Sequence, residues 1–316
     1  MQWSLQMNKN LLSLNDLSKD ELLSLLEFSE NFFNEDGGFK KEALFPDKTI
    51  AYLFFEPSTR TKCSFEIAGK NLGCSVIDFN VAGSSVSKGE SIFQTVDALS
   101  LMGVNLCIVR HTESVISELA EYMPEMTFIN AGEGSISHPT QALIDLMTIR
   151  QFKNNFDNLK ITIVGDLDHS RVVKSFVEGI SNFPIDSLTF CGHPSMCKDY
   201  TDPVIGNFEP NLDQAILDAD VVMALRIQHE RFESDLNLNL EEYKSLYQLT
   251  TERISMAKGD AIIMHPGPIN RGVEIDSEIA DHPRSTILDQ VTNGLAIRMA
   301  VMFLVTGGST LPKPTN

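Results

Sequence analysis

Residues 49–61 read Thr-Ile-Ala-Tyr-Leu-Phe-Phe-Glu-Pro-Ser-Thr-Arg-Thr. The apolar run 49–53 has the length and composition of a buried parallel strand, and we expect a helix to start soon after it. The first turn of a helix exposes backbone N–H groups and the positive end of the helix dipole, which together attract an anion. Residues 58–61 add three hydroxyls and the planar charge of Arg60, so this turn predicts a phosphate site. In the alternative interpretation, Ser58 is only an N-cap and Arg60 is a solvated surface residue.

Short apolar runs alternate with longer amphipathic ones along the rest of the chain. The first series predicts strands at 49–55, 75–79 and 106–109 with helices at 59–72, 91–101 and 114–122. The second series predicts strands at 161–164, 187–190, 220–224 and 261–264 with a helix at 171–180. Strands that alternate with helices indicate an α/β fold in which parallel sheets are flanked by crossover helices.

The length of 316 residues exceeds the usual size of one hydrophobic core, so we expect two domains. A predicted helix at about 141–152 and the polar stretch 153–158 separate the two series. We predict a first domain of residues 1–139 and a second domain of residues 140–290. A last helix is predicted within about 291–316.

The net charge of −18 is typical of a soluble enzyme and argues against nucleic acid as a partner. The N-terminus lacks the features of a signal peptide, and the sequence shows no apolar stretch near the ~20 residues that cross a bilayer. Five scattered cysteines are typical of reduced, mostly buried thiols. We therefore expect a cytoplasmic protein without a membrane partner.

Two segments resemble cofactor motifs only in part. Residues 191–197 hold Cys191, His193 and Cys197, but no fourth zinc ligand lies nearby, so we predict no metal site there. Residues 163–166 end a predicted strand with one glycine, whereas a dinucleotide fingerprint needs three, so we expect no nicotinamide cofactor. Asp166 is expected to hold the loop around Arg171 or to cap the following helix.

Seven motifs in one order resemble the aspartate and ornithine carbamoyltransferases over about residues 50–275. They are Ser-Thr-Arg-Thr at 58–61 with Ser-Phe-Glu at 64–66, Gly-Ser-Ser-Val-Ser-Lys-Gly-Glu at 83–90, Val-Arg-His at 109–111, His-Pro-Thr-Gln at 138–141, Val-Gly-Asp-Leu at 164–167 with Arg171, Arg-Ile-Gln-His-Glu-Arg at 226–231, and His-Pro-Gly-Pro at 265–268. The resemblance implies transfer of a carbamoyl group from carbamoyl phosphate to an amino acid, without a metal or cofactor. It also implies that the last helix, within about 291–316, crosses back to pack on the first domain.

The resemblance also implies a set of residues that bind carbamoyl phosphate. The set consists of Ser58, Thr59, Arg60, Thr61, Ser84, Lys88, Arg110, His138, Gln141, Pro266 and Gly267. Within it, Arg60, Thr61, Lys88, Arg110 and His138 are expected to act in catalysis by stabilising the charge that develops on the carbonyl and phosphate oxygens. Gln141 and the backbone carbonyls of Pro266 and Gly267 are expected to accept from the carbamoyl NH2 group.

The family loop that contains Lys88 reaches the active site of a neighbouring subunit, which implies a homotrimer with shared sites. Lys88 would also contact the acceptor amino acid. Arg171, Arg226 and Gln228 match the family residues that bind the two carboxylates of aspartate. Ornithine enzymes of the family have a His-Cys-Leu-Pro motif where this chain has His-Pro-Gly-Pro at 265–268, so Pro266 stands in place of their cysteine, and Gly267 departs from the leucine often seen there. The implied product is N-carbamoyl-L-aspartate, in de novo pyrimidine biosynthesis. The polar segment 229–247 is expected to be a closing loop or, alternatively, a solvated face.

Three alternatives stay open at the level of sequence. In the first two, the acceptor is ornithine or an acylated ornithine instead of aspartate. In the third, the chain is a catalytically silent paralogue that binds phosphate and serves as an assembly subunit. The retention of Arg60, Lys88 and Arg110 argues against the silent paralogue. Association with a regulatory chain or a dihydroorotase is a further open alternative.

Overall fold

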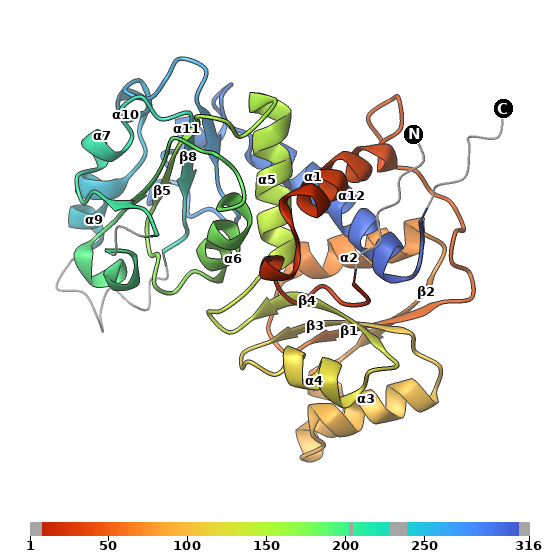
Figure 1. Ribbon diagram of the computed structural model, residues 1–316. Coiled ribbons are helices and arrows are strands. Elements are labelled where there is room, and N and C mark those ends of the chain that lie inside the picture. Colours follow the sequence, from red (N-terminus) through yellow and green to blue (C-terminus); the bar gives the residue numbers. More distant parts are fainter. Residues whose placement is uncertain (1–7, 202–204, 228–238, 310–316) are drawn as a thin grey trace. The chain divides into compact units, whose positions relative to one another are not determined.

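The computed structural model describes residues 8–201, 205–227 and 239–309, and the chain divides into two compact units (Figure 1). Unit 1 is made of Met1–Ile144 and Thr292–Asn316, and unit 2 is made of Asp145–Val291. The division falls inside helix α5 (Pro139–Lys153), whereas the sequence places it before residue 140.

Unit 1 is built on a four-stranded parallel sheet with the order β2-β1-β3-β4. The strands are β1 (Thr49–Phe54), β2 (Ser75–Phe79), β3 (Leu106–His111) and β4 (Thr127–Glu133). The helices are α1 (Lys19–Ser29), α2 (Thr59–Asn71), α3 (Ile92–Leu101), α4 (Ile116–Tyr122) and most of α12 (Ile287–Val305), with 3-10 turns η1 (Leu14–Asp16), η2 (Glu30–Phe32), η3 (Val81–Gly83) and η4 (Ser85–Lys88). The chain order reverses between β1 and β3, which makes that point the topological switch of the sheet.

The two faces of this sheet are covered by different helices, as Figure 1 shows. On one face, β1 and β3 side chains such as Leu53 and Val109 form a buried cluster with Leu99 of α3 and Leu119 of α4. On the other face, the Tyr52 hydroxyl donates to the Phe65 carbonyl of α2 at 2.8 Å. Helix α2 is therefore tied directly to the strand that precedes it.

Helix α12 packs in unit 1 through Phe303, whose ring lies 5.4 Å from Phe28, 6.1 Å from Phe32 and 5.4 Å from Phe45 between centroids. It has 19 residues and is apolar enough to cross a membrane by length and composition, so the expectation that no stretch approaches this length is wrong. Of its most apolar window, 72% is buried inside the protein, as in the core helix of a soluble protein.

Unit 2 is built on a five-stranded parallel sheet with the order β7-β6-β5-β8-β9. The strands are β5 (Lys160–Val164), β6 (Ser187–Cys191), β7 (Asn207–Phe208), β8 (Val221–Ala224) and β9 (Ile262–Met264). The helices are α6 (Arg171–Ile180), α7 (Leu212–Ala215), α9 (Leu240–Tyr247), α10 (Thr251–Ile254) and α11 (Ser277–Ala280), with 3-10 turns η5 (Pro194–Met196) and η6 (Lys198–Tyr200). The switch of this sheet lies between β5 and β8.

The predicted α/β architecture with two parallel sheets is confirmed. The sequence analysis missed β4 and β7 and the short helices α7, α10 and α11. Strand β3 extends two residues beyond the predicted end, so Arg110 lies inside the strand, next to its last residue, rather than after it.

Candidate functional site

The predicted site residues of unit 1 follow the carboxyl ends of all four strands of its sheet. Residues 58–61 come after β1, and Arg110 lies at the end of β3, where it is paired in register with Phe54. Ser84 and Lys88 follow β2, while His138 and Gln141 follow β4. Carboxyl ends of parallel strands meet at one edge, and ligands bind there, at the switch point. The residues that follow β1, β3 and β4 therefore lie at the carboxyl edge of the sheet that contains the β1/β3 switch.

The turn between β1 and α2 has the features of an anion site. Ser58 occupies the N-cap position of α2, but its side chain makes no capping hydrogen bond. The first turn contains no acidic residue, and Thr59 and Arg60 are exposed whereas Thr61 is buried. The alternative in which Ser58 serves only as a cap is therefore not what the structure shows. Its hydroxyl and the N–H groups of the first turn are placed to donate to an anion.

Arg110 is held in place by two groups, one of them an anion. Its Nη1 donates to the Ala131 carbonyl of β4 at 3.1 Å, and its Nε lies 3.1 Å from Oε2 of Glu56. The side chains of Arg110 and Glu56 are only 11% and 19% exposed. The Glu56 carboxylate thus places a negative charge beside Arg110.

Arg298 is a cation that the sequence analysis missed. It lies on α12, is fully buried, and stacks over the Phe65 ring of α2 at 5.0 Å. Its Nη1 donates to the Gly294 carbonyl at 3.4 Å. Burial, together with repulsion from Arg110 and Arg60, lowers the pKa of Arg298 to about 9. Arg298 is therefore a third guanidinium close enough to Arg60 and Arg110 to be repelled by them. In the sequence, its only signal was a single arginine within the mostly apolar segment 291–305.

The loop after β2 forms the 3-10 turns η3 and η4. The Ser84 hydroxyl donates to the Val81 carbonyl at 2.7 Å and accepts from the Val86 N–H at 3.3 Å, so it is bonded within its own loop. Lys88 ends η4 and is exposed. The structure thus presents the Lys88 ammonium to solvent at this edge of the unit.

The predicted site residues of unit 2 also lie at one sheet edge. Arg171 is the first residue of α6, after β5, and Arg226 is exposed just after β8, so the two flank the β5/β8 switch. Pro266 and Gly267 follow β9, the next strand, and Gly267 has a φ of +69°, a conformation that suits glycine. Gln228 lies outside the described residues.

Asp166 holds its loop rather than capping α6. Its Oδ1 lies 2.8 Å from Nδ1 of His169, while the cap of α6 is Ser170, whose hydroxyl accepts from the Val173 N–H. Asp168 accepts from the backbone N–H groups of Lys198 and Asp199 at 2.9 and 3.1 Å. The segment around the predicted Cys/His cluster therefore braces the loop that leads to Arg171.

That cluster has the geometry of packed side chains. Cys191 and Cys197 are buried, and Nδ1 of His193 lies 2.7 Å from the Ser195 hydroxyl. Among residues 8–201, 205–227 and 239–309, no group of three or more His, Cys, Asp or Glu side chains is placed to hold a metal ion.

The predicted closing segment 229–247 is in part a helix. Residues 229–238 lie outside the described part of the chain, and Leu240–Tyr247 forms α9. Asn239 and Glu242 form a capping box at its start, and Glu241 pairs with Lys244 at 2.9 Å. Two of the acidic residues thus stabilise a helix.

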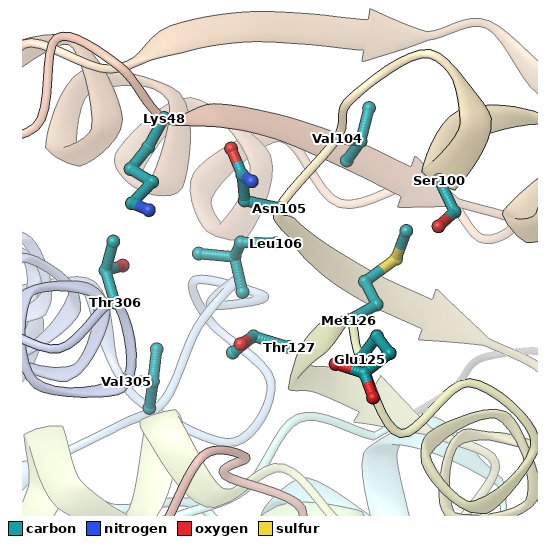
Figure 2. Close-up of a pocket in the computed structure, with 10 residues that line it drawn as sticks. All are labelled: Lys48, Ser100, Val104, Asn105, Leu106, Glu125, Met126, Thr127, Val305 and Thr306. Carbon is teal, nitrogen blue, oxygen red and sulfur yellow. The ribbon is translucent and has the colours of Figure 1, made fainter.

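A separate hollow of about 190 Å³ opens at the opposite edge of the unit 1 sheet (Figure 2). Lys48, Asn105 and Met126, which directly precede β1, β3 and β4, lie around it with Val305 and Thr306. The hollow therefore lies at the amino ends of the strands, and none of the predicted site residues lines it.

Comparison with known proteins agrees with this geometry. Residues 9–151 match the family domain described as "Aspartate/ornithine carbamoyltransferase, carbamoyl-P binding domain", and residues 157–305 match the one described as "Aspartate/ornithine carbamoyltransferase, Asp/Orn binding domain". The aspartate carbamoyltransferase catalytic subunit of Carboxydothermus hydrogenoformans is 43% identical over 305 residues, which cover 95% of this chain and 97% of the relative.

Two solved structures are similar over nearly the whole chain. Aspartate transcarbamoylase from Trypanosoma cruzi, in complex with carbamoyl phosphate and aspartate, has a TM-score of 0.83 at 28% identity, covering 96% of this chain and 98% of that one. Ornithine carbamoyltransferase from Pyrococcus furiosus has a TM-score of 0.80 at 28% identity, covering 95% and 97%. Since family domains match both halves of its sequence, this chain belongs to the aspartate/ornithine carbamoyltransferase family.

Proposed function

We propose that this chain is an enzyme that transfers the carbamoyl group of carbamoyl phosphate to the amino group of L-aspartate, giving N-carbamoyl-L-aspartate and phosphate. The observation that carries the proposal is the uncapped hydroxyl of Ser58 at the start of α2, beside Arg60 and the buried Arg110. The similarity to aspartate carbamoyltransferases supports the acceptor and, through that activity, a role in pyrimidine biosynthesis.

The phosphate of the donor binds at the turn 58–61 and to Arg110, whose guanidinium exchanges Glu56 for the phosphate. During transfer, the acceptor nitrogen attacks the carbamoyl carbon, and the bond from that carbon to the phosphate oxygen breaks. The electron pair leaves with the phosphate, and the acceptor nitrogen releases one proton. The hydroxyls and guanidinium groups at the turn stabilise the charge that the phosphate gains, which lowers the barrier to bond breaking.

The carbonyl of the donor receives hydrogen bonds or charge from Thr61, Arg110 and His138, and its NH2 group donates to Gln141 and to the carbonyls of Pro266 and Gly267. Thr61, Arg110 and His138 are each less than one-tenth exposed, which supports fixed positions for these donors. Thr59, Arg60, Ser84 and Lys88 complete the donor site in this proposal.

The acceptor binds through its two carboxylates. Arg171 and Arg226 lie on either side of the β5/β8 switch, which supports two separate cationic contacts, as a dicarboxylate requires. Ornithine would bring a cationic side chain to one of these two arginines. Gln228 and Lys88 are proposed to complete the acceptor site.

The same proposal includes a homotrimer in which Lys88 acts in the site of a neighbouring chain. The exposed position of Lys88 on η4 supports it. We also propose a cytoplasmic location, supported by the five free cysteines.

Arg60→Ala tests the proposal of function. We expect the wild-type chain to form carbamoyl-aspartate and one equivalent of phosphate, and the folded Arg60→Ala chain to form neither at a measurable rate. Normal turnover by Arg60→Ala would contradict the proposal.

Mixing unfolded Arg60→Ala and Lys88→Ala chains and refolding them together tests the shared site, because only hybrid oligomers regain sites with both residues. No recovered activity would contradict the sharing.

A further inference from the structure

His265 is buried directly after β9, and its side chain has no exposed surface. Its backbone N–H donates to Oε1 of Gln290 at 2.9 Å, and Nε2 of Gln290 donates to Oδ1 of Asp145 at 2.8 Å. The backbone of His265 is therefore fixed, and its ring cannot reach solvent or a substrate. Any role of this ring in the reaction must act through the groups that it contacts.

Both ring nitrogens of His265 make hydrogen bonds. Nδ1 accepts from the Gly267 N–H at 2.8 Å, and Nε2 lies 3.1 Å from Oε1 of Glu274. Because Nδ1 accepts, the hydrogen of the neutral ring is on Nε2 and is donated to the carboxylate. A hydrogen on Nδ1 would face the Gly267 N–H, and two donors would repel each other. The contacts thus select one tautomer and one ring orientation.

The bond to the Gly267 N–H also orients the Pro266 carbonyl. These two groups belong to one peptide plane, and in a trans peptide the N–H and the C=O point in opposite directions. With the N–H turned inward to the buried ring, the Pro266 carbonyl is turned away from it. That carbonyl is one of the two proposed to accept from the carbamoyl NH2 group.

The same network continues to the acceptor side of unit 2. Oε1 of Glu274 also accepts from the Asn270 N–H at 2.6 Å, and Nδ2 of Asn270 donates to the Ile227 carbonyl at 3.0 Å. Ile227 is the residue after Arg226. One chain of hydrogen bonds therefore joins the peptide at Pro266 and Gly267 to the backbone beside Arg226.

We propose that His265, Glu274 and Asn270 are positioning residues that hold these two substrate-binding segments in a fixed relation to each other. The proposal rests on the proposed function. His265 orients the carbonyl that binds the carbamoyl group, and Asn270 holds the backbone that presents Arg226 to the acceptor. Glu274 joins the two because one of its oxygens bonds to both partners.

Three variants separate the two ends of the network. His265→Asn keeps an acceptor for the Gly267 N–H, because an asparagine side chain bonds to the N–H two residues on. His265→Leu removes that acceptor. Asn270→Asp keeps the shape of the side chain and replaces the donor to Ile227 by an acceptor.

We expect His265→Leu to raise the KM for carbamoyl phosphate about tenfold, because it loses the hydrogen bond to the Gly267 N–H. His265→Asn keeps that bond, so its KM for carbamoyl phosphate should stay within about threefold of the wild-type value. Asn270→Asp is expected to raise the KM for aspartate about tenfold. A purely structural role would lower the melting temperature and the active fraction, and would leave both constants of the folded enzyme unchanged. Equal constants in the wild type and all three variants would overturn the proposal.

Amide hydrogen exchange gives a readout that needs no activity. Exchange at the Gly267 N–H should accelerate at least tenfold in His265→Leu and little in His265→Asn, and equal exchange in both would overturn the proposal. If the wild-type chain makes no carbamoyl-aspartate but the two variants differ in exchange at the Gly267 N–H as expected, the proposed function is contradicted. The hydrogen-bond network is then still supported. If His265→Leu does not fold, Asn270→Asp decides by its KM for aspartate.

Discussion

Replacing Glu56 by glutamine should tighten the binding of inorganic phosphate. Nε of Arg110 lies 3.1 Å from Oε2 of Glu56, and both side chains are largely buried. A phosphate that binds Arg110 must exchange with this carboxylate. Arg110 keeps its bond to the Ala131 carbonyl at 3.1 Å, so the guanidinium stays oriented in the variant.

The expected gain in phosphate affinity comes from two effects, each of which lowers the Kd. Glutamine has no charge to pair with the guanidinium, so the ion pair that phosphate must displace, worth roughly 1 kcal/mol, is lost. Removing the carboxylate also removes its repulsion of the phosphate, worth roughly another 1 kcal/mol at an intermediate dielectric constant. The sum of about 2 kcal/mol corresponds to a Kd about 30-fold lower.

Titration calorimetry with phosphate measures this change, and Glu66→Gln is the matched control. Glu66 lies on α2 and pairs at 2.6 Å with Lys70, a lysine that is not among the predicted site residues. The control removes the same charge and should change the Kd less than about twofold, because solvent screens that exposed pair. An unchanged or higher Kd in Glu56→Gln would refute the competition between Glu56 and phosphate.

Three further predictions concern burial and packing. Arg298→Met should raise the melting temperature without phosphate, since it removes a buried charge whose pKa is lowered to about 9, and should raise the Kd for phosphate about tenfold; a lower melting temperature or an unchanged Kd would contradict this. At pH 8 only Cys63 should react with a thiol reagent in the folded protein, because the other four thiols are buried and keep their protons; burial raises the pKa of Cys107, for example, to about 12. In denaturant all five thiols should react, and a second fast-reacting thiol in the folded protein would contradict the prediction. Gly69→Ala should destabilise the fold by about 1–3 kcal/mol in urea unfolding, because a Cβ there lies 2.7 Å from the Tyr52 hydroxyl, and Tyr52→Phe should recover part of that loss; strictly additive effects would exclude the clash.

Elements with a strong local signal were predicted well from the sequence. The helix α6 and the strand β2 have the predicted bounds, and α1 starts with a capping box between Ser18 and Glu21, a local pattern that marks a helix start. In each case the residues that decide the structure are close together in the sequence. A cap or an apolar run bounded by turn residues is enough to locate such an element.

Strand β4 was missed because its sequence contains polar residues that only the folded chain satisfies. Asn130 is buried, and its Nδ2 donates to the Leu12 carbonyl at 3.1 Å, 118 residues away in sequence. Glu133 is also buried, and its Oε1 accepts from the N–H groups of Val115 and Ile116 at the start of α4. No local pattern reports such long-range partners.

The candidate site likewise contains residues whose place was predictable from the local sequence and residues whose place was not. Residues 58–61 and Arg110 follow apolar runs, so their place at a sheet edge was predictable from the sequence. Arg298 and the His265 network were not, because their partners come from elements far apart along the chain. The ion pair of Glu56 with Arg110 likewise depends on the pairing of β1 with β3.

The choice between L-aspartate and L-ornithine as acceptor decides whether Arg171 and Arg226 bind two carboxylates. The enzyme receives carbon-labelled carbamoyl phosphate with equal concentrations of L-aspartate and L-ornithine in one vessel, and mass spectrometry identifies the labelled product. The account predicts labelled carbamoyl-aspartate, with its formation lost in Arg226→Ala. Labelled citrulline as the main product would contradict the assignment of Arg171 and Arg226 to two carboxylates, and no labelled product would contradict the proposed enzyme activity itself.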